Sequence, residues 1–280
     1  MNVSNEEPKV FTVGTPPNHR RIAFRRRAPA QSGKSGLNKS GLVKPGLVWL
    51  CGYRSDMVST KASALDAEAE RLGLGFLRFD YSGHGRSEGR LQDGTISQWL
   101  AETLAIFRAE TEGPQIVVGS SMGGYLALLA ARALQAAGES DRLAGLVLIA
   151  PAVDFTEALI WAQAPEEARR AIMEEGAWRP PSAYSDEPDV FTRALIEDGR
   201  KHLLMSGIIR TFAPVAVLQG MQDESVPYTH ALSLMERLAG DPATLTLVKD
   251  GDHRLSRPQD IVLLFGTLER MIESVAPDRR

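Results

Sequence analysis

Three polar residues, far apart in this sequence, carry the side chains of a nucleophile, an orienting acid and a base. Ser121 lies in IVVGSSMGGYLAL, Asp223 in VAVLQGMQDESVP and His253 in TLTLVKDGDHRLS. A serine hydroxyl becomes a good nucleophile when an imidazole accepts its proton, and a carboxylate fixes the tautomer of that imidazole. Each residue follows a run typical of a buried strand. The order Ser, Asp, His therefore predicts a catalytic triad for acyl transfer.

Two adjacent serines compete for the role of nucleophile, and sterics distinguish them. The pattern G-x-S-x-G places a serine on a tight strand-to-helix turn, where residues two positions away on either side must be small. Gly119 and Gly123 flank Ser121 in this way, whereas a valine and a methionine flank Ser120. The pattern therefore predicts Ser121 as the nucleophile, at the N-terminus of a helix whose free N–H groups favour negative charge.

Acyl transfer also requires hydrogen-bond donors for the oxyanion, each contributing roughly 100-fold to 1000-fold in rate. The backbone N–H of Met122, immediately after the nucleophile, is one candidate. The second is expected in the loop LCGYRSD, which follows an early strand. Gly52 lets this loop turn tightly, so we expect the backbone N–H of Tyr53 to be the second donor.

Other reactive side chains have simpler interpretations. Glu224 is an alternative to Asp223, but it lies one residue nearer the Ser-Val-Pro turn. Asp250 and Asp252 are so close to His253 that they are expected to shape its loop. His84 lies in a Gly-rich loop. Cys51 ends a strand and is expected to be a small buried core residue.

Alternating strand and helix patterns must position these residues. The expected strands are residues 46–51, 75–79, 116–119, 143–150, 215–219 and 244–248, and the expected helices are residues 57–72, 95–112, 122–137, 228–239 and a last one near Pro258. Such alternation predicts an α/β fold with a mostly parallel sheet, flanked by helices on both faces. We expect residues 1–280 to form one domain.

Residues 152–213 interrupt this rhythm with a long, mostly helical pattern. The segment is too long for an ordinary connection, and it is expected to form a helical cap insertion over the carboxyl edge of the sheet, where open α/β sheets bind ligands. Its aromatic residues are suited either to lining an apolar pocket or to forming the core of the cap: Trp161, Trp178, Tyr184 and Phe191.

The N-terminal part is basic. Residues 1–46 hold nine Lys and Arg against Glu6 and Glu7, or +7, in a chain of net charge −3. RRIAFRRRAPA is expected to be an edge strand whose arginines discourage association between edges. Residues 31–46 are expected to form a flexible Gly/Ser/Lys loop. Their GKS lacks the upstream glycine of a phosphate-binding loop, so no nucleotide cofactor is predicted.

Composition excludes several classes of protein. The 280 residues are 43% hydrophobic, with no apolar run long enough to span a membrane. The single cysteine and the spacing of the five histidines give no metal-site pattern, so no metal is expected. Because the N-terminus lacks both a secretory signal and a convincing presequence, the expected location is cytoplasmic. Binding of nucleic acid or a membrane surface by the basic N-terminus is a rival that we do not favour.

The sequence resembles the α/β-hydrolase superfamily over nearly its whole length. RFDYSGHGRSEG, GPQIVVGSSMGGYL, GAWRPPSAYS and GDHRLS are similar to the family of mitochondrial α/β-hydrolase domain palmitoyl-protein thioesterases, also described as mycophenolic acid acyl-glucuronide esterases. The resemblance implies hydrolysis of thioesters or activated esters by Ser121, Asp223 and His253 without a cofactor. The implied partners are a small-molecule ester or thioester, or an acylated protein.

Three alternatives remain open. Within hydrolysis, the chain could be an acyl-glucuronide esterase or a lipase-like enzyme. From another class, it could be a catalytically silent binding protein with a hydrolase fold, since fold does not imply function.

Overall fold

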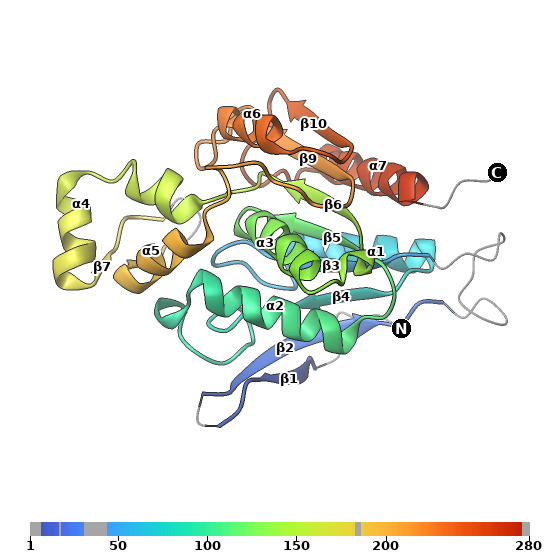
Figure 1. Cartoon of the computed structure of the whole chain (residues 1–280), viewed down its shortest axis with the longest axis horizontal. Helices are drawn as coiled ribbons and strands as arrows, with labels where there is room; N and C mark the ends of the chain where they lie inside the picture. The colour runs from blue at the N-terminus through green and yellow to red at the C-terminus, as the bar shows by residue number, and fades with distance from the viewer. Residues whose placement is uncertain (1–6, 17, 31–43, 183–185, 276–280) are drawn as a thin grey trace.

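A single eight-stranded sheet runs through the computed structural model, which describes residues 7–16, 18–30, 44–182 and 186–275 (Figure 1). The strands in chain order are β1 (Lys9–Val13), β2 (Arg20–Arg27), β3 (Gly46–Leu50), β4 (Phe76–Phe79), β5 (Gln115–Ser120), β6 (Leu143–Ile149), β9 (Val215–Gly220) and β10 (Ala243–Val248). They are arranged in the order β1-β2-β4-β3-β5-β6-β9-β10. Only the pairs β1–β2 and β2–β4 of this sheet are antiparallel. The predicted α/β fold with a mostly parallel sheet is confirmed.

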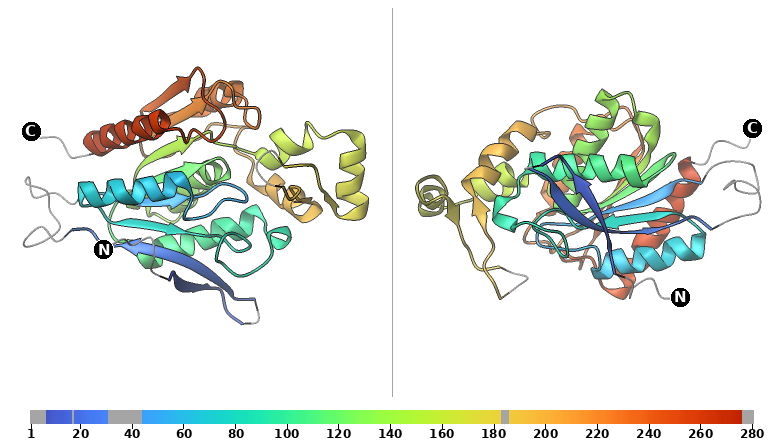
Figure 2. Two further views of the ribbon diagram at one scale, coloured as in Figure 1. Left: turned by 180° about the vertical axis from the view of Figure 1, so that it is seen from behind. Right: turned by 90° about the horizontal axis from the view of Figure 1, so that it is seen from below.

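Helices cover both faces of the sheet. They are α1 (Thr60–Leu72), α2 (Ile96–Glu110), α3 (Met122–Ala136), α6 (Tyr228–Arg237) and α7 (Pro258–Val275), with short 3₁₀ turns η2 (Leu91–Asp93) and η3 (Ser140–Arg142). Figure 2 shows α1 and α7 on one face and α2 and α3 on the other. Because both faces are covered, the central strands carry mostly apolar residues on both sides rather than alternating with polar residues, and their few polar side chains, such as Arg78 and Gln219, are buried.

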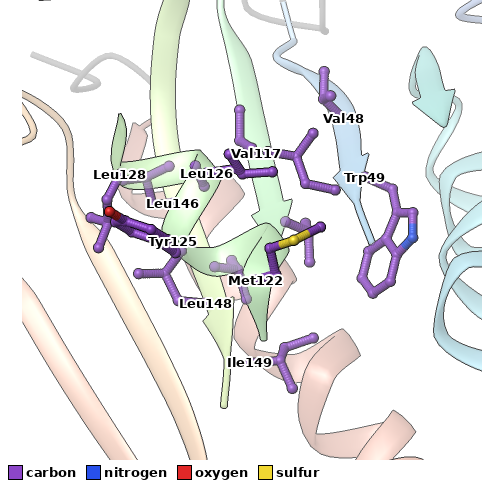
Figure 3. Packing of buried hydrophobic residues seen from close by; sticks show 14 of the residues in the cluster. Val48, Trp49, Val117, Met122, Tyr125, Leu126, Leu128, Leu146, Leu148 and Ile149 are labelled. Carbon is purple, nitrogen blue, oxygen red and sulfur yellow. The ribbon is translucent and has the colours of Figure 1, made fainter. Parts of the chain in front are cut away.

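The centre of the core lies where α3 packs on β5 and β6. Figure 3 shows Tyr125 and Leu126 of α3 close to Val117 of β5 and Leu146 of β6. All four side chains are buried. This packing fixes the start of α3 relative to the end of β5, and therefore the turn between them.

Residues between β6 and β9 form a separate group of short elements beyond the sheet (Figure 1). They are the π-helical turns η4 (Thr156–Trp161) and η5 (Ala171–Glu175), the helices α4 (Glu166–Arg170) and α5 (Arg193–Gly199), the 3₁₀ turn η6 (Arg200–His202) and the antiparallel pair β7 (Ala177–Trp178) and β8 (Phe191–Thr192). The pair β7–β8 is a feature that the helical pattern does not predict. Tyr184 lies outside the described residues.

The sequence-based prediction for the N-terminal strand is wrong in one respect. β2 is not an edge strand, because β1 pairs with one side of it and β4 with the other. Its arginines pair with carboxylates: Arg20 binds Glu102 and Arg27 binds Asp66. Most of the expected loop, residues 31–43 with the GKS motif, lies outside the described residues. The last residue of the expected loop, Gly46, is the first residue of β3.

A buried ion pair anchors α1 to the sheet. Arg78 of β4 is only 2% exposed, and its guanidinium donates to Asp66 of α1 at 2.9 Å and to the Met57 carbonyl at 3.1 Å. Asp66 also accepts a hydrogen bond from Arg27 at 2.9 Å and raises the pKa of that arginine. Burial lowers the pKa of Arg78, and the neighbouring Asp66 carboxylate acts in the opposite direction.

We expect Asp66→Ala to destabilise the protein by about 3–5 kcal/mol, because the Arg78 charge then stays buried without its partner. Urea denaturation measures this loss. The matched control is Glu88→Ala, which removes the exposed Arg21–Glu88 pair and should cost no more than about 1 kcal/mol. Equal losses in the two variants would contradict the structural role of the buried pair.

Candidate active site

Ser121 occupies a strained turn between β5 and α3. Its backbone has φ 55° and ψ −118°, a conformation that serine rarely adopts and that costs of order 1–3 kcal/mol. The surrounding chain holds it there, because the Ser121 N–H donates to the Ile149 carbonyl at 2.8 Å and the Ser121 carbonyl accepts from the Ala152 N–H at 3.1 Å. Ser120 is the last residue of β5, so Ser121 is the residue at the turn.

Two glycines allow this turn to form. A Cβ added at Gly119 would overlap the backbone of Gly123, and one added at Gly123 would overlap the carbonyl of Leu50 in β3. The backbone contacts therefore require glycine at both positions that flank Ser121, as the sequence pattern predicts.

The three predicted triad side chains form one hydrogen-bonded line. The Nε2 atom of His253 lies 3.1 Å from the Ser121 hydroxyl oxygen, and its Nδ1 atom lies 2.8 Å from a carboxylate oxygen of Asp223. An ionised carboxylate only accepts hydrogen bonds, so Nδ1 carries the proton and Nε2 is free to accept the serine proton. The geometry is that required for general-base activation of Ser121.

Asp223 is itself held by several donors. Its Oδ1 atom accepts from the backbone N–H groups of Ser225 and Val226 at 2.9 and 2.8 Å. Its Oδ2 atom, which faces His253, also accepts from Gln219 Nε2 at 3.0 Å. Sequence reasoning did not identify Gln219. The sequence feature that could have identified Gln219 is a polar amide near the end of the otherwise apolar strand VAVLQG. In the structure this side chain is fully buried.

The competing acids lie elsewhere. Glu224 is exposed. Asp250 binds Arg257 at 2.7 Å, and Asp252 accepts from the Leu255 N–H at 2.9 Å, so both shape the loop that carries His253.

The two remaining reactive side chains are buried. Burial raises the pKa of the Cys51 thiol and lowers the pKa of His84 to about 4. The His84 ring contacts Tyr53, Tyr81 and Trp99 edge-on. Cys51 is therefore a core thiol, as predicted, and His84 is a neutral loop residue within an aromatic cluster.

Met122 and Tyr53, the two expected oxyanion donors, both lie near Ser121. Met122 is the first residue of α3, and the N–H of a first helical residue has no acceptor within its own helix. Gly52 packs against the turn so closely that an added Cβ would lie 3.3 Å from the Ser121 Cβ. Tyr53 follows Gly52 directly and lines the same cavity as Ser121.

Tyr53 and Arg54 connect this loop to the segment between β6 and β9. The Tyr53 hydroxyl donates to the Val190 carbonyl. The Arg54 guanidinium donates to the Pro188 carbonyl at 2.7 Å and to Asp189 at 3.1 Å. The sequence places both residues after a strand but does not show these contacts.

A cavity of about 920 Å³ opens beside Ser121 and His253. One part of its lining is apolar and comes from the segment between β6 and β9: Phe155, Leu159, Ile160, Ala164, Trp178 and Phe191. Another part is polar and cationic: Arg54, Ser59, Thr60, Lys61, Arg254 and Ser256. Trp161 instead packs under the guanidinium groups of Arg169 and Arg200. The cavity suits a substrate with an apolar portion and a polar portion.

None of the described helices is long and apolar enough to cross a membrane. Across the residues that the structure describes, no group of three or more His, Cys, Asp or Glu side chains is arranged to hold a metal ion.

The chain is similar to proteins of known structure and activity. It is 36% identical over 233 residues to the mouse (Mus musculus) protein "Palmitoyl-protein thioesterase ABHD10, mitochondrial", covering 83% of this chain and 76% of the relative. A crystal structure from Agrobacterium vitis S4 superposes with a TM-score of 0.88 at 48% identity, covering 95% of this chain and 98% of that one. The structure of mouse alpha/beta hydrolase domain-containing protein 10 gives a TM-score of 0.81 at 31% identity, covering 96% and 100%.

The expected cytoplasmic location is wrong by this comparison. The mouse, bovine and human relatives are all named as mitochondrial proteins. The expectation depended on the composition of the N-terminal residues, and the comparison carries more weight because it covers most of the chain.

The model of the alpha/beta hydrolase family matches residues 42–263, which include β3, the strained turn and the loops that carry Asp223 and His253. The resemblance seen in the sequence is thereby confirmed. With this match and relatives that share more than a third of their aligned residues, the chain belongs to the α/β hydrolase family.

Proposed function

We propose that this hydrolase cleaves carboxylic ester or thioester bonds with Ser121 as nucleophile, His253 as general base and Asp223 as the residue that orients His253. The hydrogen-bonded line from Ser121 through His253 to Asp223 is the observation that supports these roles most strongly. The names of the relatives support the class of bond, because they are palmitoyl-protein thioesterases.

The reaction follows from the positions of these atoms. The Ser121 oxygen attacks the acyl carbon while its proton moves to His253 Nε2. The N–H groups of Met122 and Tyr53 stabilise the oxyanion. The intermediate then collapses, the bond to the leaving oxygen or sulfur breaks, and His253 protonates the leaving group. Water attacks the acyl-enzyme with the same base, which releases the acid and restores Ser121.

The cavity supports an apolar acyl group. We propose that residues 152–213 form a cap over the single hydrolase domain of residues 1–280. Its apolar lining, which includes Leu159, Trp178 and Phe191, contacts the acyl chain, and the leaving group then occupies the polar part. An acylated protein and a small-molecule ester or thioester both fit this division.

We expect Ser121→Ala to reduce kcat for ester hydrolysis by on the order of 10⁶-fold, since the triad acts as a unit. Steady-state kinetics measure this loss, and a fluorophosphonate probe should label the peptide that contains Ser121 in the wild-type protein. Ser120→Ala is the matched control, because it makes the same change one residue away and should retain labelling. Labelling of Ser120, or near-normal activity of Ser121→Ala, would overturn the assignment.

Asp223→Asn is expected to lower kcat by roughly 10⁴-fold, because an amide in place of the carboxylate favours the wrong imidazole tautomer. Glu224→Gln removes the neighbouring carboxylate and should leave kcat within about twofold of the wild type, as expected for an exposed residue away from His253. A larger loss in Glu224→Gln than in Asp223→Asn would reverse the roles of these two acids.

Acyl-chain preference tests the apolar side of the cavity. We expect kcat/KM to increase from acetyl to octanoyl esters by up to about fourfold per methylene, the value for complete burial. Leu159→Ser should lower kcat/KM about fivefold to tenfold for the octanoyl ester and much less for the acetyl ester, since the acetyl group has far less apolar surface to bury. An equal loss on both esters would show that Leu159 acts on the fold and not on the acyl chain.

A further inference from the structure

Lys61 lies against the loop that carries His253. It is the second residue of α1 and is only 9% exposed, which is unusual for a lysine. Its ammonium donates to the carbonyl of Arg254, the residue after His253, and to the Ser256 hydroxyl at 3.2 Å. An element from the opposite end of the hydrolase sequence therefore holds the backbone immediately beside the base.

The loop at this point needs such support. Leu255 has a φ of 42°, a left-handed conformation that branched apolar side chains disfavour, and its side chain is buried. The Leu255 N–H donates to Asp252 at 2.9 Å, and the Ser256 hydroxyl donates to the Arg254 carbonyl at 3.0 Å. Lys61 joins this set of bonds from outside the loop. Strained backbone of this kind persists only where several contacts fix it together.

We propose that Lys61 is a positioning residue that holds His253 in line with Ser121 by fixing the carbonyl of Arg254. The proposal rests on the proposed function of the triad. Its consequence is that the loop cannot shift away from α1, so His253 Nε2 keeps its 3.1 Å distance to the Ser121 oxygen. A displacement of about 1 Å in such a group lowers the rate by up to roughly 100-fold.

The surroundings of Lys61 are unfavourable for a charged side chain. Burial lowers its pKa to about 8; Asp252 and Asp260 act in the opposite direction, and Arg254 adds to the lowering. Burial therefore opposes the charged ammonium, and its hydrogen bonds to Arg254 and Ser256 offset that cost.

A different role for Lys61 makes a distinct prediction. Lys61 and Arg254 also line the cavity, so Lys61 could act by binding a negatively charged leaving group. Binding of that kind would raise KM for anionic substrates alone. A positioning residue instead lowers kcat for neutral and anionic leaving groups by the same factor, because the same His253 serves both.

The test compares Lys61→Met with Lys44→Met. Lys44 is exposed and donates to the Leu72 carbonyl at the far end of the same helix, at 3.1 Å, so its variant loses the same type of bond away from the site. For Lys61→Met we expect kcat to fall about 10-fold to 100-fold on both a neutral and an anionic ester of one acyl chain, with KM within twofold and Tm unchanged or higher. Lys44→Met should match the wild type in kcat.

Three results would overturn the proposal: unchanged kcat, a rise in KM confined to the anionic ester, or a loss of Tm that accounts for the loss of activity. Ser256→Ala provides a second variant if Lys61→Met does not fold, and we expect a twofold to fivefold lower kcat with an unchanged Tm. Fluorophosphonate labelling of wild-type Ser121 separates the proposed function from the proposed role of Lys61. If Ser121 is not labelled, the proposed function is wrong. If Ser121 is labelled but Lys61→Met has an unchanged kcat, only the positioning role of Lys61 is wrong.

Discussion

The strained backbone at Ser121 is the constraint on which the rest of the site depends. Its conformation brings the hydroxyl out above the carboxyl ends of the strands, and it is unfavourable by itself. β3, β5, β6 and α3 all take part in holding it, through the close approach of Gly123 to Leu50 and the hydrogen bond from Ser121 to Ile149. The apolar packing of α3 shown in Figure 3 therefore stabilises both the fold and the position of Ser121, the proposed nucleophile.

Parallel pairing of β9 with β10 brings the other two residues of the proposed triad together. The last pair in their register joins Gly220 to Val248, so both strands end at the same level. The loops that follow lie in contact, since a Cβ added at Gly220 would overlap the carbonyls of Gly251 and Asp252. Asp223 and His253 thus meet because of strand register and a glycine that lets two loops pack closely.

Much of this arrangement could be predicted from the sequence, and the exceptions have a common physical cause. Ser121, Asp223 and His253 are recognisable because each follows a short run of apolar and β-branched residues that predicts a strand, a local signal. The contacts of Gln219, Lys61 and Arg54 are not recognisable in this way, since each depends on which distant segment packs against it. The same cause explains the error over β2: its arginines suggest an exposed edge, but their partners come from helices later in the chain.

Tyr53 links the two halves of the proposed mechanism in a single residue. Tyr53 comes directly after Gly52, which packs beside the turn at Ser121. Its ring stacks on Phe191, and its hydroxyl donates a hydrogen bond to the Val190 carbonyl. The neighbouring Arg54, with a left-handed φ of 57°, adds further bonds to the same segment. A movement of residues 187–191 would therefore pull directly on the loop that carries Tyr53, the proposed oxyanion donor. Since such donors must be fixed before charge develops on the substrate, the contacts proposed to cover the acyl chain would also contribute to the electrostatic preorganisation of the site.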